Sequence, residues 1–135
     1  MSAADQPATR DATPPPAPFG ECRVILVPTD HERSRRFYTD AVGLEVMAIF
    51  DDDSGMLLRL NAGATLELLR EPFGPTSPGA RFALEAGSLE ACRDRLQRAG
   101  VDCPEPERQP WGHRTMTVVD PDGNAITFFQ AEEAP

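Results

Sequence analysis

The chain has 135 residues, with 22 acidic and 13 basic side chains and a formal net charge of −9. All thirteen basic residues are arginine, so chemistry that needs a lysine is excluded, including Schiff-base and pyridoxal-phosphate catalysis and a Walker-type phosphate loop. The acidic balance argues against duplex nucleic acid and against an anionic membrane surface as partners. We therefore expect a small-molecule partner that is neutral, cationic or partly apolar.

Length and composition predict one ordinary folded domain. Hydrophobic residues make up 40% of the chain, yet no apolar run is long enough to cross a bilayer. The N-terminal residues contain no hydrophobic signal segment, so we expect a cytoplasmic protein. Cys22, Cys92 and Cys103 show no CxxC spacing, which favours reduced, buried thiols over a zinc site.

Proline content divides the chain into segments. Residues 1–19 hold five of the fourteen prolines and are predicted to be a disordered extension. Residues 20–130 form the expected domain, with modules at about 21–71 and 80–130 joined by a stiff linker at 71–79. Residues 131–135 are predicted to be a short tail.

The first half predicts a strand, a helix and three further strands. The helix is expected to start at an Asp30 cap and to end at Gly43. The strands are predicted at 22–27, 44–50, 56–60 and 65–69.

The second half repeats this order. A strand at 81–86 precedes a helix capped by Ser88 and ending at Gly100, and an irregular edge strand is predicted at 105–109. A hairpin of strands 114–119 and 125–130 closes the half. Its turn, DPDGN at 120–124, combines a proline suited to a type I turn with a glycine suited to a left-handed position.

Alternation along the strands separates two faces of each sheet. Leu66, Leu68, Ile126 and Phe128 mark all-apolar faces that should lie under helices. The opposite faces mix polar and apolar side chains. A concave face of that kind is typical of small-ligand sites.

Two segments carry a family resemblance. PTDHERSRRFYTDAVGLEV and WGHRTMTVVDPDGNAITFFQ resemble motifs of the vicinal-oxygen-chelate superfamily, which includes glyoxalases, extradiol dioxygenases and bleomycin-resistance proteins. The resemblance covers about residues 20–130. It implies an α+β fold in which two paired βαβββ modules form a curved mixed sheet around a groove, usually in a homodimer.

The resemblance also marks where metal-binding members hold their ligands. Those positions fall on Arg23, Glu67, Arg81 and Thr127, and only Glu67 retains a typical ligand side chain. Arginine stays protonated and does not coordinate a metal, and two fixed cations repel a divalent ion. We therefore expect no metal and no other cofactor.

The resulting hypothesis is that the chain is a metal-free small-molecule-binding protein. One function that fits this hypothesis is antibiotic sequestration, as in antibiotic-resistance proteins. We expect binding rather than catalysis. The alternative is a lyase, isomerase or dioxygenase-like enzyme of the same superfamily that uses Glu67 with an atypical or absent metal. A third possibility is a stress or regulatory module without chemistry of its own.

The predicted site residues lie on the mixed faces. The ligand groove is predicted to contain Arg23, Ile25, Glu67, Arg81, Trp111, Thr127 and Phe129. Glu67 and His113 are the candidate catalytic residues. Trp111 forms either an aromatic wall of the groove or a packed anchor of its strand.

Several charged and aromatic residues have a structural alternative. Arg23 and Arg81 either bind a ligand anion or pair with Glu67 or Glu85. If the pair is buried, Glu67→Ala should destabilise the fold by about 3 kcal/mol or more. His31 and the arginines at 33, 35 and 36 are predicted to be solvated. Phe37 and Tyr38 are predicted to pack in the core.

Overall fold

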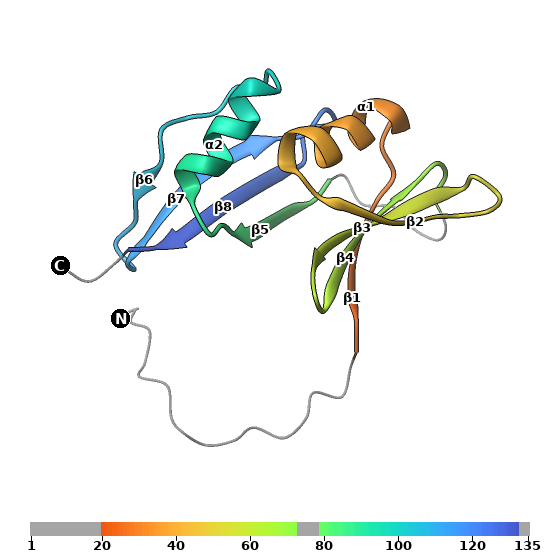
Figure 1. Ribbon diagram of the computed structural model, residues 1–135, viewed down its shortest axis with the longest axis horizontal. Helices are drawn as coiled ribbons and strands as arrows, with labels where there is room; N and C mark the ends of the chain where they lie inside the picture. The colour runs from red at the N-terminus through yellow and green to blue at the C-terminus, as the bar shows by residue number, and fades with distance from the viewer. Residues whose placement is uncertain (1–19, 73–78, 133–135) are drawn as a thin grey trace.

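The computed structural model describes residues 20–72 and 79–132. The predicted extension at 1–19, most of the linker and residues 133–135 lie outside these ranges. Two strand–helix–strand–strand–strand units follow each other along the chain (Figure 1). The first comprises β1 (Cys22–Leu26), α1 (His31–Arg36), η1 (Phe37–Val42), β2 (Glu45–Ile49), β3 (Gly55–Asn61) and β4 (Ala64–Leu69). The second comprises β5 (Arg81–Glu85), α2 (Leu89–Arg98), β6 (Glu107–Arg108), β7 (His113–Val119) and β8 (Ala125–Ala131).

Each unit builds one four-stranded mixed sheet. The strand orders are β1-β4-β3-β2 and β5-β8-β7-β6, so the first strand of each unit lies beside its last strand. Those two strands run parallel, and the other neighbours run antiparallel. The repeated order and the α+β class confirm the predicted glyoxalase/bleomycin-resistance architecture.

The predicted helix caps are present. The Asp30 carboxylate accepts a hydrogen bond from the Arg33 amide at 3.0 Å, and Ser88 caps α2 in the same way. The sequence periodicity did not predict that α1 continues as the π-helix η1. This wider turn ends at Gly43, which has a φ of 91° and donates its amide to the Tyr38 carbonyl. Glycine suits that left-handed position because it has no Cβ.

The hydrophobic core lies between the helices and the sheet faces that they cover (Figure 1). The alternation predicted this face correctly, because its apolar positions on the inner strands are almost completely buried. Phe37 and Tyr38 are buried as predicted. The buried core includes Leu26, Leu58, Leu66, Leu68, Leu89, Leu96, Met116, Val118, Ile126 and Phe128.

A buried polar network joins the two units. Tyr38 of η1 donates its hydroxyl hydrogen to Asp120 Oδ2 at 2.7 Å, and both side chains are almost fully buried. Asp120 also accepts hydrogen bonds from the Asn124 amide and from the Asn124 side chain, both at 2.8 Å. Nearby, Thr29 donates to Asp122 at 2.6 Å. The DPDGN turn of the second unit is therefore held by the helical segment of the first.

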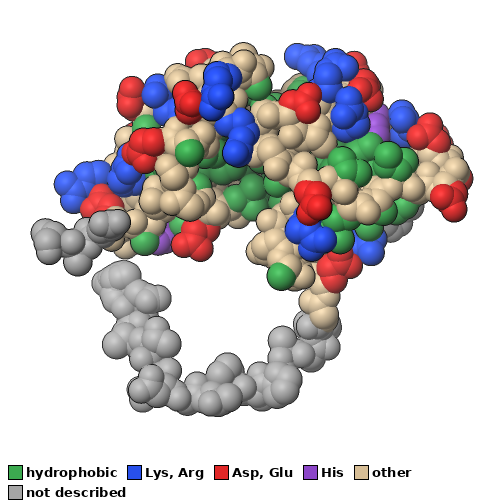
Figure 2. All heavy atoms as spheres, viewed as in Figure 1, with side chains coloured by type: hydrophobic (Ala, Val, Ile, Leu, Met, Phe, Trp, Pro, Cys, Tyr) green, Lys and Arg blue, Asp and Glu red, His purple; other side chains and the backbone are tan. Residues whose placement is uncertain are grey.

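The surface over the helices alternates in charge. Figure 2 shows arginine and acidic side chains next to one another on this face. Ion pairs such as Arg98–Asp94, at 2.7 Å, account for part of this pattern. Arg33 and Arg36 are exposed, as predicted for a solvated helix face.

Two sequence-based interpretations are wrong. Cys22 is exposed at the start of β1, although Cys103 is buried and Cys92 is partly buried. His31 is buried at 8% exposure rather than solvated, because its ring lies against β4 with Nε2 3.4 Å from the Leu68 carbonyl oxygen. The periodic pattern placed His31 on the first turn but gave no sign of the strand beneath it. Among the described residues, the structure has no helix long and apolar enough to span a membrane.

Candidate functional site

The first half of the candidate site is the face of the N-terminal sheet that points away from the helices. Strand register places Ile25 of β1 beside Glu67 of β4, which in turn lies beside Leu57 of β3. Arg23 lies one row away, beside Thr65. Ile25 is 43% exposed, whereas Glu67 is only 9% exposed. This face therefore combines an accessible apolar side chain with a sheltered carboxylate.

That carboxylate belongs to an ion-pair network. Arg23 Nη1 lies 3.3 Å from Glu67 Oε1, and Arg23 Nε lies 3.0 Å from Glu21 Oε1. Glu21 also accepts a hydrogen bond from the Thr65 hydroxyl at 2.7 Å. The hydrogen bond from Thr65, together with Arg23, lowers the pKa of Glu21, while the hydrogen bonds to Glu21 and Glu67 raise the pKa of Arg23. The predicted pairing of Arg23 with Glu67 is confirmed.

The second half of the site is the corresponding face of the C-terminal sheet. Arg81 and Thr127 lie in successive rows of β5 and β8, and Arg81 is exposed. The Thr127 hydroxyl exchanges a 2.7 Å hydrogen bond with the Thr117 hydroxyl. Further along β8, Phe129 stacks on His113 with ring centroids 5.0 Å apart. The described residues contain no ion pair between Arg81 and either Glu67 or Glu85, so the predicted pairing of Arg81 is not found there.

Trp111 lies in the turn between β6 and β7. Gly112 makes this turn with a φ of 94° and donates its amide to the Gln109 carbonyl. The tryptophan is 53% exposed, which is unusual for a side chain of this size. This exposure argues against the packed-anchor alternative and leaves the indole accessible to a ligand.

Six of the seven predicted groove residues fall into two groups, one on each sheet, and Trp111 lies in a turn. Arg23, Ile25 and Glu67 are brought together on the first, and Arg81, Thr127 and Phe129 on the second. Within residues 20–72 and 79–132, no hydrogen bond or ion pair connects the two groups. Sequence reasoning did not include Glu21, Thr65 or Thr117 among the site residues, although all three shape these faces. Alternation pointed to Thr65, but the contact between Glu21 and Thr65 depends on strand pairing that sequence alone does not give.

The side chains at the family's metal positions do not fit a divalent cation. They offer one carboxylate, one hydroxyl and two guanidinium groups, and the carboxylate is already bound by Arg23. Protonated arginine is not a ligand, and one carboxylate with one hydroxyl is too small a donor set for zinc, nickel or manganese. Elsewhere in the described parts of the chain, no three His, Cys, Asp or Glu side chains gather as a metal site.

These observations define the class of the protein: an α+β chain with two βαβββ units and mixed sheet faces left open on the side opposite the helices. The chain belongs to the Glyoxalase/Bleomycin resistance protein/Dioxygenase superfamily, whose family model matches residues 22–128. No curated protein sequence matches it.

Solved structures show what the chain is similar to. TnmS3, an antibiotic-binding protein from Streptomyces sp. CB03234, is 30% identical with a TM-score of 0.71, and the match covers 86% of this chain and 98% of TnmS3. A glyoxalase/bleomycin resistance protein from the same strain is 29% identical with a TM-score of 0.64, covering 80% and 97%. Lactoylglutathione lyase from Agrobacterium tumefaciens shares the fold at 18% identity and a TM-score of 0.68, covering 86% and 95%.

Proposed function

We propose that this protein binds a small molecule without a metal, as an antibiotic-sequestering protein would. The observation that carries the proposal is the Arg23–Glu67 ion pair, which occupies the one carboxylate left at the family's metal positions. The 30% identity to an antibiotic-binding protein supports the same conclusion. The ligand we propose is cationic or partly apolar, since the chain is acidic and Ile25 and Trp111 are accessible.

We further propose that two copies of the chain complete the groove. Each sheet exposes half of the predicted site, and large apolar side chains stay accessible on the described surface, including Ile25 and Val27. A homodimer would cover these side chains and face the Arg23 group of one chain with the Arg81 group of the other. We place this dimer in the cytoplasm.

The fluorescence of Trp111 tests binding directly, because the chain has a single tryptophan. We expect saturable quenching by a bleomycin-type cationic glycopeptide or by an apolar polycyclic antibiotic. Arg81→Gln should alter the affinity, whereas Arg98→Gln, which changes a paired arginine on α2, should not. If neither the cationic glycopeptide nor the polycyclic antibiotic quenches the Trp111 fluorescence or stabilises the protein against heat, the proposal is wrong.

Metal content separates binding from the enzymatic alternative. The purified protein should contain no stoichiometric Zn, Ni, Mn or Fe, and added metal should leave ligand affinity unchanged. A stoichiometric metal that is lost together with a lyase or isomerase activity in Glu67→Gln would overturn the proposal. That result would favour the alternative in which the protein is an enzyme that uses Glu67.

A further inference from the structure

A second cleft lies where the helical segment of the first unit meets the second unit, and within its lining Val119 alone belongs to a mixed sheet face. Its volume is about 580 Å³. One wall comes from α1 and η1, and the other from residues 99–102 after α2 and from the turn between β7 and β8. The cleft is lined by Arg33, Arg36, Phe37, Asp40, Ala41, Ala99, Val101, Asp102, Val119, Asp120 and Pro121.

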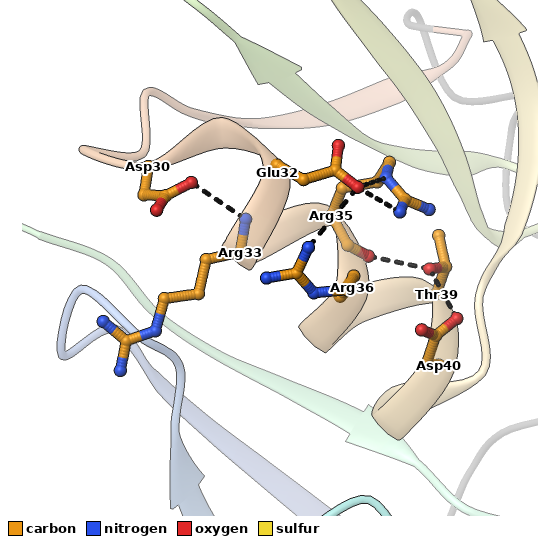
Figure 3. Close-up of polar contacts among 7 residues, drawn as sticks. All are labelled: Asp30, Glu32, Arg33, Arg35, Arg36, Thr39 and Asp40. Atoms are coloured by element: carbon orange, nitrogen blue, oxygen red, sulfur yellow. Dashed lines mark hydrogen bonds and ion pairs between the residues drawn. The ribbon is translucent and has the colours of Figure 1, made fainter.

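Arg33 differs from most arginines of the described chain. Its guanidinium has no hydrogen-bond or ion-pair partner among residues 20–72 and 79–132, a property that it shares there only with Arg81. Figure 3 shows the Arg33 side chain extended away from α1, while Arg35 and Arg36 turn toward Glu32. Arg36 keeps only a long contact to Glu32, at 3.6 Å. The cleft therefore presents one guanidinium without a partner and a second that is loosely held.

Three aspartates also line the cleft, but they differ in availability. Asp120 already accepts four hydrogen bonds, from the Tyr38 hydroxyl, the Asn124 side chain and the amides of Asp122 and Asn124. These donors satisfy both of its oxygens. Asp40 and Asp102 are exposed. Their charges repel any anion placed beside them, and they repel a ligand with more than one negative charge most strongly.

The remaining lining is apolar. Phe37 and Ala41 are buried beneath the cleft, and Val101 is half-buried. Aliphatic and aromatic surface of this kind offers an organic ligand a place to remove its own apolar atoms from water. A small inorganic anion would leave that surface uncovered.

We propose that this cleft is a second small-molecule site, selective for a monocarboxylate with an apolar body. The carboxylate would bind between Arg33 and Arg36, because guanidinium groups recognise carboxylates through paired N–H donors. The apolar body would lie on Phe37, Ala41 and Val101. Occupancy would bridge the two units beside the Tyr38–Asp120 contact. This site is separate from the groove, and the proposal does not depend on the function proposed above.

The test uses phenylacetate as the probe and the full-length protein labelled with ¹⁵N. Phenylacetate should shift the amide signals of residues lining the cleft, such as Ala41 and Val101, in a saturable way. Phenylacetamide and 2-phenylethylamine have the same ring without the negative charge and should bind at least tenfold more weakly. Arg33→Gln should weaken phenylacetate binding about tenfold. Arg98→Gln is the matched control and should leave it unchanged, because Arg98 pairs with Asp94 on α2.

Several results would overturn the proposal. Equal shifts by the acid, the amide and the amine would show that the ring binds without charge recognition. Unchanged affinity in Arg33→Gln, with a spectrum otherwise like that of the wild type, would show that this guanidinium is not used. Shifts confined to Arg81 and its strand neighbours would assign phenylacetate to the groove. Since Arg33 is exposed, the variant is expected to fold.

Discussion

Replacing Tyr38 with phenylalanine tests the contact that joins the two units. The substitution removes one hydroxyl from a side chain that is 1% exposed, and it leaves the ring packing against Phe37 in place. The lost hydrogen bond is the 2.7 Å contact to Asp120 Oδ2. Three other donors still form hydrogen bonds with Asp120, so the substitution does not leave its buried carboxylate without partners.

The expected loss follows from the charge and burial of this bond. Hydrogen bonds to charged groups contribute about 1.5–3 kcal/mol, so we expect Tyr38→Phe to lower the free energy of unfolding by about 2 kcal/mol. For a domain of this size, the melting temperature should fall by roughly 8 °C. Urea denaturation followed by circular dichroism measures the first quantity, and calorimetry measures the second.

Thr29→Val provides the matched control. Thr29 donates an equally short hydrogen bond, 2.6 Å, to Asp122 in the same turn, but at an exposed position. Water replaces such a bond, so we expect a loss of no more than about 0.5 kcal/mol. Equal losses in the two variants, or a loss below about 0.5 kcal/mol in Tyr38→Phe, would refute the argument that burial makes this contact important.

Tyr38 should also determine how the stability of the protein changes at alkaline pH. Burial, with the Asp120 carboxylate as hydrogen-bond partner and neighbouring charge, strongly raises the pKa of Tyr38. The unfolded chain ionises this tyrosine near pH 10, so the stabilising effect is complete below that pH and is lost as the pH rises above it. Tyr38 is the single tyrosine, so tyrosinate absorbance should appear only as the protein unfolds. Tyr38→Phe should show a shallower alkaline decline; a native-state titration near pH 10 would contradict the prediction.

Three further predictions concern the Arg23–Glu67 ion pair, the glycine that ends η1, and the stability of the protein at acidic pH. Glu67→Ala should cost about 1 kcal/mol in urea denaturation rather than the larger loss of a buried pair, because Arg23 is 41% exposed and keeps a second partner; a loss above 3 kcal/mol would contradict this. Gly43→Ala should cost about 1 kcal/mol or more, because its φ is 91° and a Cβ would lie 2.9 Å from Arg95, while Gly63→Ala, with open space around it, should be near neutral. Arginine partners lower the pKa of several carboxylates, so stability that is complete above about pH 4.5 should fall as the pH drops through their lowered values; a flat melting temperature from pH 7 to pH 3 would refute this.

Local chemistry made most of the fold predictable from sequence. Asp30 and Ser88 cap the helices, and the Asp120–Asn124 turn forms with Gly123 at a φ of 86°, because each depends on neighbouring residues alone. The π-helix could not be predicted in this way. Its backbone hydrogen bonds span five residues rather than the four of an α-helix, and the positions of Phe37, Tyr38, Ala41 and Val42 are compatible with either.

The candidate site was less predictable because its contacts cross between strands. Alternation placed Arg23 and Glu67 on the same sheet face, and their ion pair followed from the parallel pairing of β1 with β4. The burial of His31 depends on the Leu68 backbone, 37 residues away. The Arg33 cleft is formed by three segments of the chain, so no single segment indicates it.

The location of the family motifs explains why the resemblance identifies the fold better than the activity. The FY pair and the DPDGN turn carry much of the resemblance, and the structure shows Tyr38 bound to Asp120 at the contact between the units. Both motifs therefore help to hold the two units of this chain together. The positions at which the resemblance places metal ligands lie instead on the open sheet faces, where this chain has Arg23 and Arg81. The double substitution Arg23→His and Arg81→His tests this separation: the variant should keep the Tyr38–Asp120 contact and the fold while gaining affinity for zinc, measured by calorimetry. Unfolding on introduction of the two histidines would show that the sheet faces also support the fold.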